Sequence, residues 1–96
     1  MIPKPERTTD EEYLGYIQQQ DCLVCGDISE SHHLITRRTG GSDYTAVNLC
    51  REHHTEIGMG IEKFQKKYKL NVWKDAHRLF ERYTNDRIGE LIELFA

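Results

Sequence analysis

The order of hydrophobic and polar positions predicts a helix near the start of the chain. Residues 8–20 carry apolar side chains at helical spacing, with polar residues between them. This apolar stripe consists of Tyr13, Leu14 and Ile17. Thr8 and Thr9 are N-cap candidates, because a glutamate follows each of them three residues later, as in a capping box. Residues 1–7, which include two prolines, are expected to form an irregular tail.

In the centre of the chain, the order of apolar and polar residues is typical of β-strands. "HLITRR", residues 33–38, contains adjacent β-branched side chains, and "YTAVNL", residues 44–49, alternates between apolar and polar positions. Between them, "TGGSD" has the composition of a flexible turn. The pattern therefore predicts a hairpin with a long loop.

The second half of the chain returns to helical spacing. Helices are predicted over residues 50–57, 61–70 and 71–95, the last with a break around Thr84–Asp86. The last helix carries an apolar stripe of Trp73, Ala76, Leu79, Phe80 and Tyr83. Such a stripe indicates a packing core rather than a cofactor site.

These elements indicate one small α+β domain over residues 1–96. The predicted hairpin and the helix that follows it lie within residues 22–58, and residues 60–96 form a helical C-terminal extension. A domain of 96 residues buries a modest core and often needs a metal or disulfides to stabilise it.

Charge is distributed unevenly along the chain. The formal net charge is −3, but residues 31–82 hold ten basic and six acidic side chains. A basic centre is compatible with a polyanionic partner such as DNA, and equally with an ordinary solvated face. No apolar run approaches the roughly 18 residues of a membrane span, and the first residues lack a secretory signal. We therefore expect a cytoplasmic protein with no membrane partner.

Three cysteines point to a metal site rather than to disulfides, because their number is odd and no secretory signal is visible. Cys22 and Cys25 form a C-x2-C pair, and Cys50 and His53 form a C-x2-H pair. Three thiolates and one imidazole make a closed tetrahedral set, typical of structural zinc. The alternative is three ordinary buried thiols and a surface histidine. A zinc site of this kind supports the fold and is not itself catalytic.

Three further histidines remain, namely His32, His33 and His54. Neighbours on a helix point about 100° apart, so His54 should turn from the zinc toward the hairpin if His53 faces the zinc. Adjacent strand residues face opposite sides of a sheet, so His32 and His33 can share one site only if a turn or bulge lies at the start of the strand. The alternative is a histidine pair without a site. We interpret His77 as structural or surface.

The ordered set "CLVCG…SHHLITRRTGGSD…VNLCREHH" resembles the HNH endonucleases of the ββα-metal (His-Me finger) superfamily. It is most similar to the zinc-stapled type of phages and prophages, including nucleases linked to phage recombination. "GMGIEKFQKKYKLNVW" is also similar to that group, so the resemblance covers roughly residues 13–70. It implies a ββα-metal finger with a structural zinc site, flanked by an N-terminal helix and C-terminal helices, that hydrolyses DNA phosphodiesters.

The resemblance also implies roles for single residues. His33 would be the general base, and His32 and His54 would hold a catalytic Mg2+ or Mn2+. Arg37 and Arg38 would contact DNA phosphates. The products would carry a 5′ phosphate and a 3′ hydroxyl. The central asparagine that orients the base would be Asn48, with Thr45 or Asp43 as alternatives for its position.

One position departs from the family pattern. Many relatives have another metal ligand four residues after the helical histidine, where this chain has Gly58. Waters, the substrate phosphate or Glu56 would then complete the metal shell. The sequence therefore leaves two classes of function open. One is a nickase or a nuclease for duplex or branched DNA, acting alone or only with a recombination or packaging protein. The other is a non-catalytic zinc-stapled module that binds DNA or protein.

Overall fold

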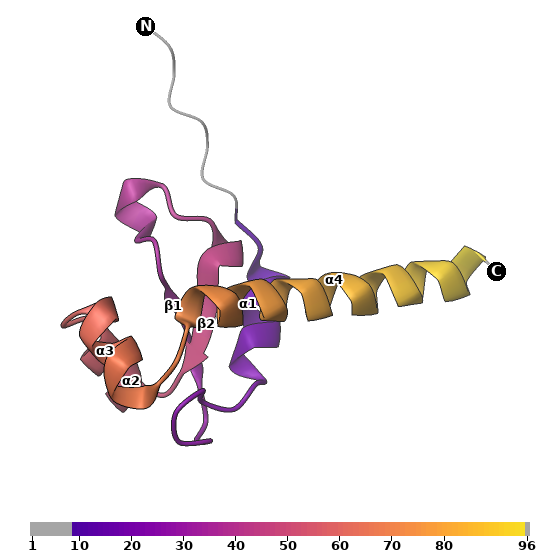
Figure 1. The fold of residues 1–96 in the computed structure, drawn as a ribbon. Coiled ribbons are helices and arrows are strands. Elements are labelled where there is room, and N and C mark those ends of the chain that lie inside the picture. Colours follow the sequence, from indigo (N-terminus) through magenta and orange to yellow (C-terminus); the bar gives the residue numbers. More distant parts are fainter. Residues whose placement is uncertain (1–8, 96) are drawn as a thin grey trace, which may run out of the picture.

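The computed structural model describes residues 9–95 and has a small α+β fold (Figure 1). The tail predicted over residues 1–7, and Thr8, lie outside the described residues. The elements are α1 (Glu11–Gln18), β1 (Glu30–His33), the 3-10 helices η1 (Arg37–Thr39) and η2 (Asp43–Thr45), β2 (Ala46–Leu49), α2 (Arg51–Ile57), α3 (Ile61–Tyr68) and α4 (Val72–Phe95). The predicted α+β class is confirmed.

The sheet consists of β1 and β2, which pair antiparallel with Glu30 opposite Leu49 and His33 opposite Ala46. The prediction of a strand over residues 33–38 was wrong, because β1 ends at His33 and the chain turns back on itself over residues 36–41. Gly41 donates its backbone N–H to the carbonyl of Thr36 at 2.9 Å, and a Cβ on Gly41 would lie 1.8 Å from the carbonyl oxygen of Ile35. This close approach requires glycine and replaces the predicted strand extension by η1.

The second strand is also shorter than the predicted span 44–49. Ser42 precedes η2, and its hydroxyl accepts a hydrogen bond from the backbone N–H of Tyr44 at 3.1 Å. The hydroxyl of Thr45 donates to the Ser42 carbonyl at 2.7 Å. These local bonds hold residues 43–45 in a helical turn, so β2 begins only at Ala46.

The two faces of the sheet pack against different helices. Val47 and Leu49 belong to a core with α2, α3 and the start of α4, whereas Ala46 packs with Tyr13 and Ile17 of α1. The N-cap of α1 is Asp10 and not one of the predicted threonines, because its carboxylate accepts from the backbone N–H of Tyr13 at 3.0 Å. The aspartate thus satisfies an N–H group that the helix itself cannot.

Helix α4 is continuous, so the predicted break around Thr84–Asp86 was wrong. The hydroxyl of Thr84 donates to the carbonyl of Phe80 at 2.7 Å and is accommodated within the helix. Ala76 and Leu79 are buried as predicted, but Trp73 is 46% exposed because Val72 takes the first buried position of the stripe. The last turns of α4 project away from the rest of the fold (Figure 1).

Within residues 9–95, no helix combines the length and the apolar character that a membrane crossing requires.

Candidate metal centre and histidine clusters

A tight turn presents the first two cysteines. Asp21 and Ile28 form an isolated bridge that closes the loop between them. Inside the loop, the Cys22 N–H donates to the Asp27 carbonyl at 2.8 Å, and the Gly26 N–H donates to the Cys22 carbonyl at 3.0 Å. Gly26 has a φ of 77°, a conformation that favours glycine. The loop therefore holds both thiols of the C-x2-C pair on one side.

The remaining two ligands come from the start of α2. Cys50 is its N-cap residue, and His53 lies in its first turn. Ligand atoms of Cys22, Cys25, Cys50 and His53 all lie within 4.8 Å of one another. Aromatic rings of α3 cover the imidazole, with the Tyr68 ring centroid 5.3 Å from that of His53. The four residues predicted from the sequence therefore form one compact cluster.

The spacing of these atoms suits a tetrahedral metal. The sulfurs of Cys25 and Cys50 lie 3.7 Å apart, and His53 Nδ1 lies 3.6 Å from Cys22 Sγ and 3.1 Å from Cys50 Sγ. A tetrahedral zinc with Zn–S of about 2.3 Å and Zn–N of about 2.0 Å separates two sulfurs by about 3.7 Å, and a sulfur from a nitrogen by about 3.5 Å. The cluster is compatible with a structural zinc site.

The surroundings of Cys22 and Cys25 shift the pKa values of their thiols in opposite directions. Burial alone would raise the pKa of Cys22, but backbone N–H groups of Cys50, Cys25 and Val24 outweigh it and lower this pKa to about 6. The backbone N–H of Asp27 acts in the same direction on Cys25, but burial and the neighbouring thiols raise the pKa of Cys25 to about 11. Without a cation, the thiol of Cys22 therefore ionises more readily than that of Cys25, and a bound zinc would change this proton balance.

A second cluster joins β1 to α2. His54 Nδ1 lies 2.6 Å from Glu30 Oε1, and the ring centroids of His54 and His32 are 4.4 Å apart. Glu30 also forms an ion pair with Arg51 at 3.1 Å. Burial, followed by the neighbouring His54 and His33, lowers the pKa of His32 to about 4, so its imidazole is neutral at neutral pH. As expected of helical neighbours, His53 turns toward the cysteines and His54 toward the hairpin.

His33 belongs to a third group of side chains. Its Nε2 lies 2.8 Å from Oδ1 of Asp43, which is 1% exposed. The other Asp43 oxygen accepts the backbone N–H of Asp10 at 2.7 Å, and the Tyr44 hydroxyl donates to Asp10 at 2.7 Å. A network of partly buried hydrogen bonds thus links His33 to the cap of α1.

The two adjacent histidines project to opposite sides of the strand. The pairing of β1 with β2 runs without interruption from Glu30 to His33, so the bulge required to turn both rings to one side is absent from this pairing. His32 pairs with Val47 of the α2-side core, and His33 pairs with Ala46 of the α1-side core. The structure therefore brings His32 to His54 and places His33 separately with Asp43.

The three candidates for the central asparagine occupy different places. The side-chain amide of Asn48 donates to the Asp21 carbonyl at 2.5 Å, and the Thr45 hydroxyl donates to Ser42. Of the three, Asp43 is the residue that contacts His33. Sequence reasoning missed Glu30 as the partner of His54, although its position two residues before His32 places both on one strand face.

The remaining predicted residues lie around these clusters. Arg37 and Arg38 are exposed on η1, in the connection between the strands. Gly58 ends α2, and the carboxylate of Glu56 is bound by Tyr68 and by Lys67 at 2.9 Å. Glu56 is therefore directed to α3 rather than to His54.

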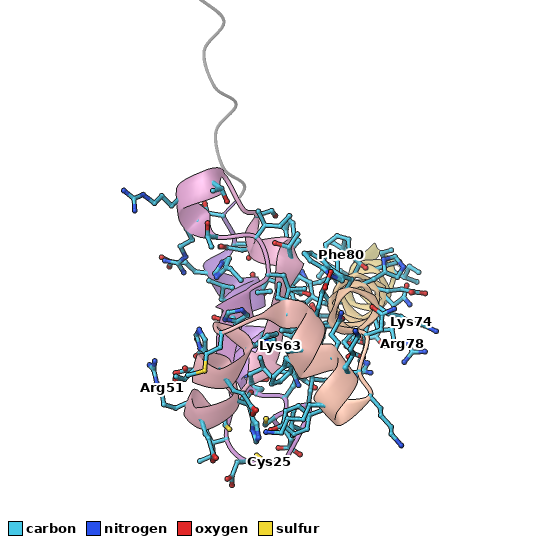
Figure 2. All side chains as sticks on the ribbon, turned by 60° about the vertical axis from the view of Figure 1, so that its left-hand side comes forward. Cys25, Arg51, Lys63, Lys74, Arg78 and Phe80 are labelled. Atoms are coloured by element: carbon cyan, nitrogen blue, oxygen red, sulfur yellow. The ribbon has the colours of Figure 1, made fainter. Side chains whose placement is uncertain are left out.

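The basic residues of the central segment come from several elements of the fold, including η1, α2, α3 and α4. Figure 2 shows Arg51 of α2 on one side of the molecule and Lys74 and Arg78 of α4 on the other, all directed outward.

Comparison with protein families matches residues 1–82 to a family described as protein of unknown function (DUF968). A curated relative, the uncharacterized protein YdfU of Escherichia coli (strain K12), is 34% identical over 73 residues. The match covers 70% of this chain and 21% of YdfU, so the chain spans about a fifth of the length of that relative. No solved structure matches the chain. The family match spans α1, both cysteine pairs, the sheet and more than the first third of α4, and on this ground the chain belongs to the DUF968 family.

Proposed function

We propose that this chain is a metal-dependent DNA endonuclease of the HNH type, with β1, β2 and α2 as its ββα-metal finger. The observation that carries the proposal is the contact between His32 of β1 and His54 of α2, whose ring centroids are 4.4 Å apart. The residue before His54 belongs to the cysteine–histidine cluster. A zinc at that cluster would therefore fix the start of α2 and, with it, the position of His54.

The environment of the two histidines supports a role as metal ligands. With a proton on Nδ1, His54 donates to Glu30 and keeps its Nε2 lone pair, an arrangement common among metal-binding histidines. His32 is neutral at neutral pH and also offers a lone pair. A hydrated Mg2+ or Mn2+ suits a site with few protein ligands, and when bound it would stabilise charge on the departing oxygen of the phosphodiester.

His33 is proposed as the general base. A proton on Nε2 would be donated to Asp43, which leaves Nδ1 to accept a proton from the attacking water. Asp43 orients the ring and stabilises the imidazolium that forms, and the N–H of Asp10 holds the carboxylate in place. The exposed Arg37 and Arg38 on η1 are proposed to contact the phosphate backbone.

A second function is favoured by one observation. His33 and His32 project from opposite sides of β1, and the His33 side chain is only 11% exposed. A zinc-stapled module that binds DNA or protein without cutting would need neither an exposed base nor a shared histidine site. In that case His33 and Asp43 would serve the fold alone.

A cleavage panel separates the two functions. Zinc-loaded protein is incubated with supercoiled, single-stranded and branched DNA in the presence of Mg2+ or Mn2+. The endonuclease proposal expects nicks with 5′ phosphate and 3′ hydroxyl ends in at least one combination. Failure in every combination, with DNA binding retained, would support the module instead. Cleavage that appears only after a recombination or packaging protein is added would identify an accessory nuclease.

A further inference from the structure

Helix α3 and its C-cap residue present a group of lysines to solvent. Residues 61–69 hold four lysines and one glutamate, a local net charge of +3, whereas the whole chain has a net charge of −3. All four lysines are exposed, while Phe64 on the other side of α3 is buried and fixes the helix to the core. A strongly positive segment in an acidic chain favours a surface that meets a negatively charged partner.

Three of these lysines have no partner within the described part of the chain. The ammonium groups of Lys63, Lys66 and Lys69 form neither an ion pair nor a hydrogen bond among residues 9–95. Lys67 differs, because it pairs with Glu56 of α2 at 2.9 Å. Lys66 lies three residues after Lys63, so the two are neighbours on the helix surface, and Lys69 follows as the C-cap residue. We call Lys63, Lys66 and Lys69 the α3 lysine group.

The helix that carries this group is attached to α2. The hydroxyl of Tyr68 donates to the carboxylate of Glu56, and the Tyr68 ring packs on His53 of the cysteine–histidine cluster. Lys67 balances the charge of Glu56 at this junction. The α3 lysine group therefore stands on a helix that packs on α2, the helix that also carries His54.

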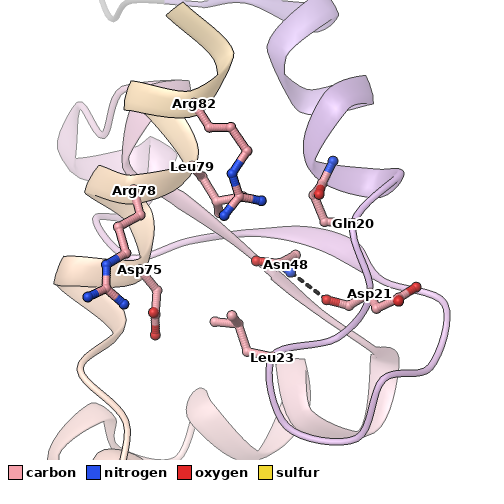
Figure 3. A pocket seen from close by; sticks show the side chains of 8 residues that line it. All are labelled: Gln20, Asp21, Leu23, Asn48, Asp75, Arg78, Leu79 and Arg82. Atoms are coloured by element: carbon pink, nitrogen blue, oxygen red, sulfur yellow. Dashed lines mark hydrogen bonds between the residues drawn. The ribbon is translucent and has the colours of Figure 1, made fainter. Parts of the chain in front are cut away.

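The exposed cations of α4 stand in a different setting. Arg78 and Arg82 line a pocket of about 270 Å³ whose lining also includes two acidic residues, Asp21 and Asp75 (Figure 3). A carboxylate beside a guanidinium repels a phosphate that approaches it. Of these two groups of cations, the α3 lysine group is therefore the better match for a polyanion.

We propose that the α3 lysine group binds the phosphate backbone of duplex DNA. The inference rests on DNA as the partner in the proposed function and adds a second contact surface to the arginines of η1. The eight residues of α3 rise about 12 Å, a length over which duplex DNA carries about seven phosphate charges. Lysine offers a point charge on a flexible stem, which suits a phosphate and lacks the planar fork of arginine. The surface should therefore hold DNA without regard to its sequence.

The salt dependence of DNA binding tests the proposal. Short fluorescent duplexes of two unrelated sequences are titrated with the zinc-loaded full chain at several salt concentrations, without Mg2+ or Mn2+. Each phosphate contact contributes about −0.9 to the slope of log affinity against log salt concentration. Replacement of the whole group, in Lys63→Gln/Lys66→Gln/Lys69→Gln protein, should therefore make the slope less steep by about 2 to 3 for both duplexes.

Two further variants separate a local contact from a general effect of charge. Lys74→Gln/Arg78→Gln/Arg82→Gln protein loses three exposed cations of α4, so its net charge changes by the same amount. Its slope should change by less than about 0.9, the contribution of one contact. Arginine at all three positions of the α3 lysine group keeps the charge and should keep the parental slope. Zinc content and melting temperature identify any variant that has misfolded.

The proposal is overturned if the folded glutamine variant of α3 keeps the parental slope, or if the α4 variant loses as much. A change confined to one of the two duplexes, or no binding by the parent protein at low salt, would do the same. The outcome is separate from that of the cleavage panel. Binding that depends on α3 without any cleavage would reject the nuclease alone, and cleavage by protein whose α3 variant binds normally would reject this inference alone.

Discussion

His54 Nδ1 lies 2.6 Å from Oε1 of Glu30, and this contact joins the second helix to the first strand across 24 positions of the chain. A carboxylate that binds one nitrogen of an imidazole fixes the ring orientation and raises the basicity of the other nitrogen. Glu30 is itself held by Arg51. The pair therefore has the arrangement of a metal-binding histidine and its supporting carboxylate.

If His54 binds the catalytic metal, Glu30→Ala should raise the Mg2+ or Mn2+ concentration needed for half-maximal cleavage about 10–100-fold. The fold and the zinc content should remain unchanged, because Glu30 is only partly buried. Metal titrations of cleavage measure the effect. Glu52→Ala, an exposed acidic residue of the same helix, is the control. An unchanged metal requirement in Glu30→Ala protein would show that Glu30 does not support a metal ligand.

Asp43→Ala tests the partly buried hydrogen-bond network behind His33. The substitution removes the acceptor of the Asp10 N–H and of His33, so unfolding should require about 1–3 kcal/mol less free energy. For a domain of this size each kcal/mol corresponds to roughly 4–8 °C in melting temperature. Thermal melting followed by circular dichroism measures the change, with Asp86→Ala at an exposed position of α4 as the comparison. A melting temperature equal to that of the parent protein would contradict the network's role.

The cysteine–histidine cluster leads to a prediction about folding. We expect purified protein to contain about one zinc per chain, and Cys50→Ser to lose both the metal and the cooperative unfolding transition. His77→Ala, which alters a histidine with a 74% exposed side chain, should keep both. Metal analysis and circular dichroism provide the two readouts. Metal-free protein that folds normally would rule out a structural zinc.

The end of α4 is expected to be dispensable for the fold. Ile88, Leu91, Ile92 and Leu94 are each more than half exposed, and the family match ends at residue 82. A chain that ends at Arg87 keeps the ion pair of Arg87 with Glu12 and loses no residue that the structure describes as buried. Its melting temperature should lie within about 2 °C of the full chain, since surface changes rarely exceed 0.5 kcal/mol. A large loss of stability would indicate that these turns pack on the domain or on a second copy.

The cysteine–histidine cluster could be predicted from the sequence because its constraints are local. Cys22 and Cys25 share one turn, and Cys50 and His53 share one helical turn, so the spacing within each pair reports the geometry directly. The orientation of His54 could be predicted for a similar reason, because neighbours on a helix point in different directions and His53 faces the cysteines.

Some errors and omissions involve contacts that leave no pattern in the sequence. The predicted strand over 33–38 was lost to the approach of Gly41 to Ile35, which no propensity records. Asp43 reaches His33 across 10 positions and Asp10 across 33, and neither pairing leaves a periodic signal in the sequence. The sequence does not show which of Asn48 and Asp43 lies beside His33, because the turn at residues 43–45 determines where the Asp43 carboxylate points.

The central claim is that His33 is the base of a DNA endonuclease, and nicking of supercoiled plasmid tests it most directly. Parent protein, His33→Ala and His77→Ala are compared at equal zinc content in Mg2+ and in Mn2+. The account predicts nicking by the parent and by His77→Ala, and a loss of at least about 100-fold in folded His33→Ala protein, as expected for removal of a general base. Nicking by His33→Ala protein at the parental rate, or none by any of the three proteins, would contradict it.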